Sequence, residues 1–386
     1  MQTLCSRPFA VASLAIGALT LSALQTQGAD FTQTNLVSDI PGLAKITDLK
    51  LKNPWGVSYR PGSPGSPGSP FWVSNQGTST ATVYGVTDKT TVRQVNIPPN
   101  GFVAIPTTAS GPRGPTGQVN NANTSSFPVA HDDGQSARFI FANLNGTISA
   151  WDGTPDLSGT ASKAFVQNSG ADGTVYTGLA INRAQTLLYA ANTSLGRIDV
   201  FDSNFAALDL GPDAFVDPSL PAGLVPFNVR DIDGFVYVVY APAGRQAQTM
   251  ADLGAGAVAV FEEDGTFINE VVVGSRLAAP WGITFAPPSF GRFAFHLLVG
   301  NFSYLHSEIN AFDPTTGELR GTIPIDTGDQ QAGGLWAIDF GVRGNNGSPD
   351  VLYFTDGINR EADGLFGAIA VAADGAIAAD GAMAAR

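Results

Sequence analysis

Cysteine, histidine and charged residues are scarce in this chain of 386 residues. The one cysteine, Cys5, lies in an N-terminal segment that we expect to be removed, so the remaining chain would have neither a disulfide nor a thiolate metal site. Only three histidines, His131, His296 and His306, are present for catalysis or metal binding. The net charge is −13 and Lys and Arg form no cluster, which argues against a nucleic-acid-binding surface.

Signature motifs of common enzyme classes are also absent. The chain contains no Gly-x-Ser-x-Gly elbow, no His-Glu-x-x-His pair and no Gly-x-x-x-x-Gly-Lys-Ser/Thr loop. Two acidic stretches, Asp231-Ile232-Asp233-Gly234 and Glu262-Glu263-Asp264-Gly265, have oxygen ligands of the kind that Ca²⁺ prefers, but neither has EF-hand spacing. Asp-Gly between strands is typical of hairpin turns, which is the interpretation that we favour.

The N-terminal 28 residues are typical of a secretory signal peptide. Arg7 precedes an apolar segment, Phe9 to Leu24, and small or polar residues follow it. The apolar segment is shorter than the roughly 20 residues of a membrane-spanning helix, so export is favoured over a retained anchor. We therefore expect a signal peptide at 1–28, one domain at 29–371 and a low-complexity tail at 372–386, in a protein exported to the periplasm or the extracellular space.

A six-fold repeat with a period above 40 residues organises the expected domain. Its anchors follow one another at steps of 61, 61, 50, 54 and 55 residues: Pro54-Trp55-Gly56, Pro115-Thr116-Gly117, Tyr176-Thr177-Gly178, Pro226-Phe227-Asn228, Pro280-Trp281-Gly282 and Leu335-Trp336-Ala337. After each anchor comes a continuous apolar run, typical of a strand buried on both faces. These runs are Phe71–Asn75, Phe139–Asn143, Leu188–Asn192, Val236–Tyr240, Leu297–Asn301 and Leu352–Asp356.

Third and fourth strands follow in most units, which predicts blades of four strands. The third strands alternate in polarity, as in Gly146–Asp152, Gly196–Asp202, Gly256–Phe261 and Glu308–Asp313. The fourth strands are expected at 91–97, 164–166, 267–273 and 318–323. The sequence thus predicts an all-β fold, a six-bladed β-propeller with four-stranded blades. The last unit lacks an outer strand, and we expect the N-terminal strand Phe31–Ser38 to complete it and close the ring.

A candidate ligand site follows from this arrangement. Adjacent strands of an antiparallel blade run in opposite directions, so the start of each innermost strand lies beside the end of the second strand. Ring closure would then gather polar and aromatic side chains around one mouth of the channel, where a polar ligand such as a sugar or peptide could bind. These candidates are Asn75, Asn143, Asn192, Tyr240, Asn301 and Asp356, with Trp55, Phe227, Trp281 and Trp336. A structural role at the strand ends is the alternative, because Asn and Asp side chains readily bond the local backbone.

The motifs resemble those of an uncharacterised family of exported bacterial six-bladed propellers, within the group that includes NHL-repeat and gluconolactonase-like proteins. The resemblance rests on segments such as Asn53-Pro54-Trp55-Gly56, Phe71–Asn75, Ala279-Pro280-Trp281-Gly282 and Gly334-Leu335-Trp336-Ala337. Some members of that family have a C-terminal PEP-CTERM sorting signal, whereas this chain has no hydrophobic helix after Ile369. The resemblance implies a fold and no particular reaction.

Gluconolactonase-like propellers bind a divalent metal in the channel, and only part of such a site is matched here. Asp356, with Asn53 or Asn228, could replace the ligands of that group, and one carboxylate with amides would bind a cation such as Ca²⁺ weakly. We therefore expect no cofactor and no metal site, and no catalytic residue is assigned.

The leading hypothesis is an exported binding or scaffold propeller whose partner is a small polar ligand, a glycan or a protein. The alternative is a metal-assisted hydrolase or lactonase-like enzyme that uses the channel. A redox propeller with a quinone cofactor is a third class, which no sequence feature favours.

Overall fold

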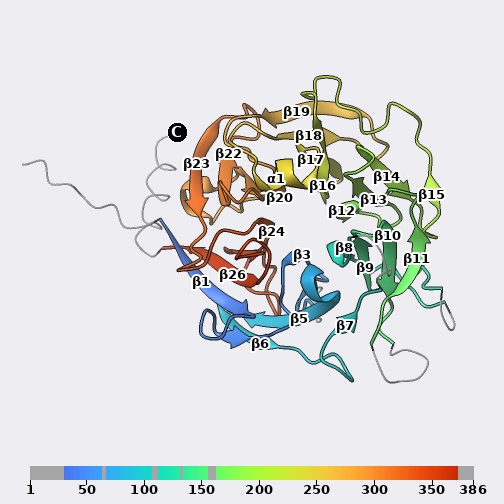
Figure 1. The fold of residues 1–386 in the computed structure, drawn as a ribbon. Helices are drawn as coiled ribbons and strands as arrows, with labels where there is room; N and C mark the ends of the chain where they lie inside the picture. The colour runs from blue at the N-terminus through green and yellow to red at the C-terminus, as the bar shows by residue number, and fades with distance from the viewer. Residues whose placement is uncertain (1–29, 63–66, 107–111, 131–133, 155–161, 373–386) are drawn as a thin grey trace, which may run out of the picture.

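Six antiparallel sheets surround one axis in the computed structural model, which describes residues 30–62, 67–106, 112–130, 134–154 and 162–372 (Figure 1). Sheet order follows chain order in five of the sheets, and the sixth sheet contains both ends of the described chain. In the described residues the α-helical part is one short helix, α1 (Arg245–Thr249). The prediction of an all-β, six-bladed propeller is confirmed.

Each blade contains four strands, ordered from the axis outward. Blade 1 contains β3 (Pro54–Ser58), β4 (Phe71–Asn75), β5 (Thr80–Thr87) and β6 (Thr91–Gln94); blade 2 contains β8 (Pro115–Asn120), β9 (Phe139–Asn143), β10 (Thr147–Trp151) and β11 (Phe165–Ser169); blade 3 contains β12 (Tyr176–Ile181), β13 (Leu188–Asn192), β14 (Arg197–Phe201) and β15 (Ala207–Leu208). Blade 4 contains β16 (Leu224–Ile232), β17 (Phe235–Pro242), β18 (Ala257–Phe261) and β19 (Phe267–Val273); blade 5 contains β20 (Pro280–Phe285), β21 (Leu297–Asn301), β22 (Glu308–Phe312) and β23 (Leu319–Pro324); blade 6 contains β24 (Leu335–Phe340), β25 (Val351–Asp356), β26 (Leu365–Val371) and β1 (Phe31–Ser38). Two short strands lie at blade edges: β2 (Ile46–Thr47) pairs with β1, and β7 (Val103–Ala104) pairs with β5.

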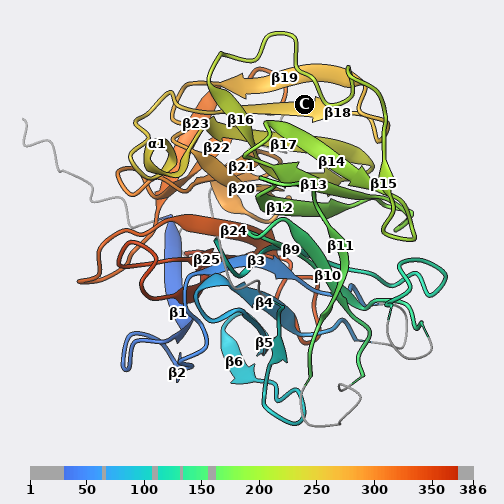
Figure 2. The ribbon, with the colours of Figure 1, turned by 45° about the vertical axis from the view of Figure 1, so that its right-hand side comes forward.

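The N-terminal strand closes the ring. Strand β1 pairs antiparallel with β26, from Phe31 opposite Val371 to Ser38 opposite Leu365, and the two lie side by side in Figure 1. Figure 2 shows β1, in blue, beside the red strands of the C-terminal blade. This pairing confirms the expected completion of the last blade. Because β1 covers the outer edge of β26, the backbone groups of that edge are paired rather than open to another chain.

Glycine at the innermost strands allows the blades to approach one another closely. At four equivalent positions an added Cβ would lie closer than 3.0 Å to an atom of another blade: Gly56, Gly117, Gly178 and Gly282. In all four cases a main-chain atom of the neighbouring innermost strand is among the obstructing atoms, so small side-chain shifts could not relieve the contact. The repeated glycine of the anchors is therefore a packing requirement of the channel.

The second strands form the buried middle of the blades. All residues of β4, β9, β13, β21 and β25 are buried, which confirms burial of these strands on both faces. The hydrophobic clusters lie between neighbouring blades, as where β9 and β13 contribute Ile140 and Leu188 to one cluster. Sheet-to-sheet packing of this kind supplies the hydrophobic core in place of a single central one.

Two turn predictions are also confirmed. Asp233 and Gly234 join β16 to β17 with positive φ angles of 57° and 87°, as hairpin turns of two residues require. Glu262–Gly265 lies in the longer connection between β18 and β19, where Gly265 has a positive φ of 86°. The expected signal peptide at 1–28 and nearly all of the tail at 372–386 lie outside the described residues.

Candidate functional site

The six second-strand ends lie at one end of their blades. Each is paired in register with the first residues of an innermost strand, as Asn75 is with Pro54 and Asn301 with Pro280. The same holds for the pairs Pro115 and Asn143, Tyr176 and Asn192, Pro226 and Tyr240, and Leu335 and Asp356. We call this end of the channel, where innermost strands begin, the start mouth, and the opposite end the end mouth.

The side chains of these six residues are buried, at 2 % exposure or less. The amide of Asn75 donates to the hydroxyls of Thr80 and Thr82, and that of Asn143 donates to Thr147. Asn301 accepts from the backbone of Ala278 and donates to the carbonyl of Arg276. Asn192 donates to Asp199.

Only the bond from Asn143 to the carbonyl of Thr147 is the local backbone contact that the structural alternative describes. The other bonds join neighbouring strands or the connection that precedes the blade, which is also a structural role. None of the six residues lines either of the two channel cavities described below. Ligand contact by them stays a prediction.

Asp356 differs from the four asparagine strand ends. Both of its carboxyl oxygens are buried and have no hydrogen-bond partner among the described residues. Burial, together with the nearby charge of Glu361, raises the pKa of Asp356 to about 7. The carboxyl group therefore binds a proton far more readily than an exposed aspartate does.

The four predicted aromatic residues lie together inside the channel. Trp55 stacks on Trp336 with ring centroids 3.4 Å apart, and Trp281 meets Trp336 edge to face at 5.6 Å. Phe302 stacks on the other side of Trp336 at 4.3 Å, and Phe227 also contacts it. All five rings belong to one buried cluster, which we call the aromatic plug. Blades 1, 4, 5 and 6 contribute to it, so the plug joins strands that are remote in the sequence.

Side chains also pair with the channel-facing carbonyls of the innermost strands. Trp281 Nε1 donates to Thr177, Asn228 Nδ2 to Trp281, and Thr355 Oγ1 to Trp55. Each bond crosses from one blade to another, so the edge groups that would otherwise need water are satisfied within the ring. Asn228, a potential metal ligand by resemblance, is engaged in this way.

Two cavities lie on either side of the aromatic plug. Trp55 lines the cavity at the start mouth, of about 490 Å³, and Trp281 lines the cavity at the end mouth, of about 270 Å³. The rings of these two residues are 6.2 Å apart, so the plug separates the cavities.

Carbon atoms make up most of the wall of the start-mouth cavity. Trp55, Leu144 and Val175 form its apolar surface, and Gly244, Arg245 and Gln248 cover it from helix α1 and the preceding turn. Two of its polar atoms, Trp55 Nε1 and Thr193 Oγ1, are buried without a hydrogen-bond partner among the described residues. The site can therefore accommodate a ligand that has an apolar body and a polar atom that accepts a hydrogen bond.

An ion pair stands at the edge of this cavity. The Arg245 guanidinium lies over the plug, 4.4 Å from the centroid of Phe302, and pairs with Glu361. Glu361 also accepts hydrogen bonds from Asn53 Nδ2 at 2.9 Å and from the Tyr304 hydroxyl at 2.6 Å. The positive charge thus contacts aromatic faces and a carboxylate at once.

Strained backbone positions Glu361. Asn359, Arg360 and Glu361 have consecutive φ angles of 55°, 55° and 69°, in the left-handed region that non-glycine residues rarely adopt. Residues in this conformation cost of order 1–3 kcal/mol each and are concentrated at functional sites. The strained backbone at Glu361 therefore indicates a functional role for its carboxylate at the start mouth.

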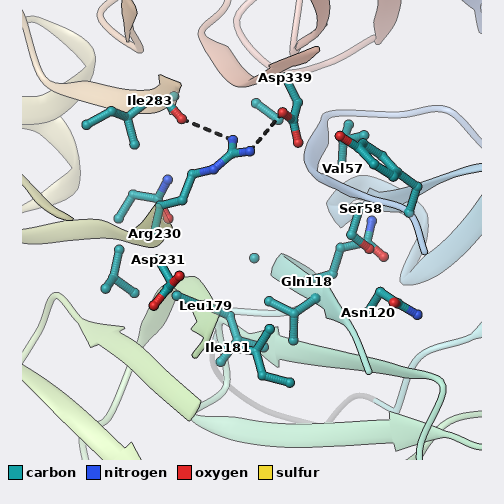
Figure 3. A pocket seen from close by; sticks show the side chains of 18 of the residues that line it. Val57, Ser58, Gln118, Asn120, Leu179, Ile181, Arg230, Asp231, Ile283 and Asp339 are labelled. Atoms are coloured by element: carbon teal, nitrogen blue, oxygen red, sulfur yellow. Dashed lines mark hydrogen bonds and ion pairs between the residues drawn. The ribbon is translucent and has the colours of Figure 1, made fainter. Parts of the chain in front are cut away.

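The end-mouth cavity has charged residues on the innermost strands themselves (Figure 3). Arg230 Nη1 donates to the carbonyls of Ile283 at 3.0 Å and Ile338 at 3.2 Å, and Nη2 pairs with Asp339 at 2.8 Å. One guanidinium from blade 4 therefore bonds blades 5 and 6. Asp231 lies away from this group in Figure 3, and burial raises its pKa to about 6, with smaller effects of Glu263 and Asp233.

Three polar side chains line the same cavity from blades 1 and 2. Gln118 Nε2 donates to the carbonyls of Gly56 and Trp72, and Asn120 Nδ2 donates to the carbonyl of Arg138. Both amide oxygens and the hydroxyl oxygen of Ser58 are buried and have no hydrogen-bond partner among the described residues. This wall therefore offers hydrogen-bond acceptors.

Sequence reasoning missed the end mouth entirely. The available signal was the occurrence of Arg230, Asp231 and Asp339 inside otherwise apolar innermost strands, where a charged residue is seldom buried without a reason. The repeated anchors predicted a ligand site at the start mouth instead.

The histidines and acidic residues form no metal site in the described part of the chain. No group of three or more His, Cys, Asp and Glu side chains there could hold a metal ion. His296 bonds the carbonyl of Ala294, His306 contacts Asp252, and His131 lies outside the described residues. Metal and cofactor content stay predictions.

Within the described ranges, no helix has the length and apolar character that crossing a bilayer would require.

Comparison with known proteins yields relatives of unassigned function. No family model matches the chain. Two uncharacterized proteins of Acanthamoeba polyphaga mimivirus are similar to it, one at 29 % identity over 86 % of this chain and 78 % of its own length, the other at 27 % over 86 % and 84 %. These relatives are viral, so the narrower resemblance to exported bacterial propellers stays a prediction.

Solved structures of several proteins are similar over most of the chain. A streptogramin B lyase matches with a TM-score of 0.49 and 11 % identity, covering 89 % of this chain and 98 % of its own. Virginiamycin B lyase from Staphylococcus aureus matches with a TM-score of 0.47 and 12 % identity, covering 89 % and 99 %. Hydrazine synthase of Kuenenia stuttgartiensis has a TM-score of 0.47 and 14 % identity, covering 82 % and 76 %. Propellers serve many unrelated activities, so such similarity transfers no function.

Proposed function

We propose that this protein is an exported binding propeller that takes a small ligand in the start-mouth cavity. The observation that carries the proposal is the cavity of about 490 Å³, whose wall is mostly carbon and which lies beside the Arg245–Glu361 ion pair. Concave, largely apolar sites with a few polar groups are the usual form of small-molecule sites. Export rests on the signal-peptide pattern of residues 1–28.

The chemistry of the wall favours a ligand with an apolar body and a hydrogen-bond acceptor. Trp55, Leu144 and Val175 supply apolar contact, and Trp55 Nε1 is a donor that has no partner in the described part of the chain. Arg245 and Glu361 neutralise each other, so the cavity carries no net charge that would demand a charged ligand. This ligand class differs from the sugar or peptide that the strand-end asparagines suggested, because those asparagines do not line the cavity.

Binding of anilinonaphthalene sulfonate tests the proposal, since this fluorescent probe combines an apolar ring system with hydrogen-bond acceptors. We expect one saturable site on the wild type and at least tenfold weaker binding by Leu144→Arg, whose side chain would occupy the cavity. Leu319→Arg, on the outer strand of blade 5, is the matched control and should bind as the wild type does. Equal binding by all three proteins, or a glycan array that identifies a sugar ligand, would overturn the proposed site.

A metal-assisted hydrolase or lactonase-like enzyme is the second candidate, and one observation favours it. Asp356 is a fully buried carboxyl group whose two oxygens have no partner among the described residues, close enough to Glu361 to feel its charge. A channel-bound divalent cation would satisfy both oxygens. Metal analysis of the purified protein tests this candidate: a stoichiometric cation that is lost in Asp356→Asn would support it, and a metal-free protein would count against it.

A further inference from the structure

We infer that the end mouth is a second binding site, which takes a small organic cation with an ammonium group. The site lies across the aromatic plug from the start-mouth cavity and does not depend on the function proposed above. Three features support this inference: the charge of the cavity, acceptors in its wall that have no partner among the described residues, and its apolar surface.

The charged side chains of the end-mouth cavity favour a cationic ligand. Three charged side chains line the cavity: Arg230, Asp231 and Asp339. Arg230 is fully engaged with Asp339 and with two carbonyls, so these two charges cancel and the guanidinium has little left to offer an anion. Asp231 forms no ion pair with any described residue, and the carboxylate supplies the uncompensated negative charge of the cavity.

The groups around Asp231 also favour a cationic ligand. One carboxyl oxygen accepts from the backbone of Gly234, and the other is buried without a donor among the described residues. Glu263 and Asp233 add negative potential, which the positive charge of Arg183 partly opposes. An ammonium group would therefore be attracted to this carboxylate more strongly than a neutral donor would.

The wall contributed by blades 1 and 2 has the matching hydrogen-bonding character. Ser58, Gln118 and Asn120 each have a buried oxygen without a partner among the described residues, while both amide nitrogens are already engaged. A buried acceptor without a donor is destabilising, because it has lost its hydrogen bonds to water and gained none in return. An ammonium group brings three donors and no acceptor, so it complements such a wall.

The remaining lining favours an organic cation over a bare metal ion. Leu179, Ile181, Ile283 and Ile338 give the cavity an aliphatic surface. A volume of about 270 Å³ is also much larger than a single ion needs. Methylene groups attached to the ammonium would cover this surface and remove it from water.

Titration calorimetry with putrescine at neutral pH and moderate salt tests the inference. We expect saturable binding to the wild type, at least tenfold weaker binding by the isosteric Asp231→Asn, and wild-type affinity for Asp264→Asn, which changes an exposed carboxylate of the next hairpin. Butanediol, of the same length without charge, should bind at least tenfold more weakly, and succinate should not bind. Affinity should fall as the pH drops below about 6, where Asp231 takes up a proton.

Three results would overturn the inference. Putrescine could give no heat of binding at millimolar concentration, succinate could bind as well as putrescine, or Asp231→Asn and Asp264→Asn could lower the affinity equally. The last result would mean that putrescine responds to the overall charge of −13 and not to this cavity. The melting temperature of each variant, measured beside the titration, shows that the loss is not caused by unfolding.

Discussion

The two mouths of one channel differ in chemistry although the same six strands form both. At the start mouth the innermost strands begin with buried rings, and the charged residues Arg245 and Glu361 come from a helix and a loop. At the end mouth the charges of Arg230, Asp231 and Asp339 lie in the strands themselves. Side chains at the starts of the innermost strands pack against one another across the axis. Polar groups at the start mouth therefore come from the segments that connect the strands.

The short distance between the blades at the axis explains why the two mouths differ. Glycine at the repeated position, as in Gly56 and Gly117, lets neighbouring innermost strands touch, and the large rings of the plug fill the space that remains. Beyond the glycine the strands can carry larger polar side chains, as Gln118 and Arg230 show, and these line a cavity. Four variants test this contrast.

Removing the centre of the plug should have the largest effect. Trp336 is fully buried and contacts Trp55, Trp281 and Phe302, so Trp336→Ala should lower the free energy of unfolding by about 4 kcal/mol. Denaturant unfolding measures the loss. Phe295→Ala, at a ring that is 63 % exposed, should change stability by less than about 0.5 kcal/mol. A loss below about 1 kcal/mol for Trp336→Ala would contradict the plug as the element that separates the mouths.

The carboxyl group of Asp356 should make stability depend on pH. Its folded-state pKa of about 7 lies above the ordinary value of 3.8, so the native state binds the proton more tightly and loses stability as the pH rises from about 4 to about 7. Asp356→Asn should remove this loss and raise the free energy of unfolding above neutral pH by on the order of 3 kcal/mol, with little change at acidic pH.

Unfolding curves of both proteins over this pH range provide the measurement. A bound cation would reverse the sign, since Asp356→Asn would then lose a ligand and become less stable at neutral pH. The same curves, repeated with a chelator, therefore separate the binding protein from the metal-assisted enzyme.

Arg230→Met should destabilise the end mouth by about 2 kcal/mol, because the change leaves Asp339 without its cation and two carbonyls without a donor. The measurement is again denaturant unfolding. Arg320→Met, at an exposed pair with Asp313, should change the free energy of unfolding much less than Arg230→Met does. Equal effects of the two variants would show that Arg230 does not join the blades.

Arg245→Met should have the smallest effect, about 1 kcal/mol, because its ion pair is partly exposed and its contact with the plug is retained in part by the methionine side chain. Comparison with Arg230→Met tests whether charge is structural at the end mouth and peripheral at the start mouth. A larger loss for Arg245→Met than for Arg230→Met would contradict that distinction.

Much of the fold could be predicted from repetition. Four of the second strands, among them Phe71–Asn75 and Leu297–Asn301, have the predicted bounds, and so has the closing strand Phe31–Ser38. The outer strand of blade 3, only Ala207–Leu208, was not predicted, because two exposed residues carry no periodic pattern. The roles of the strand-end asparagines were open, since the same residue serves a turn or a ligand.

The number of blades, most of their strands and the seam at which the chain ends meet follow from the sequence alone, because alternation, burial and turn chemistry act over a few residues. Which side chains meet at the axis depends on the tertiary structure. Trp55 and Trp336 are separated by most of the chain and stack because ring closure brings blades 1 and 6 together. The difference between the two mouths therefore arises from closure of the ring. Contacts between blades depend on the distance across the axis and not on the distance along the chain.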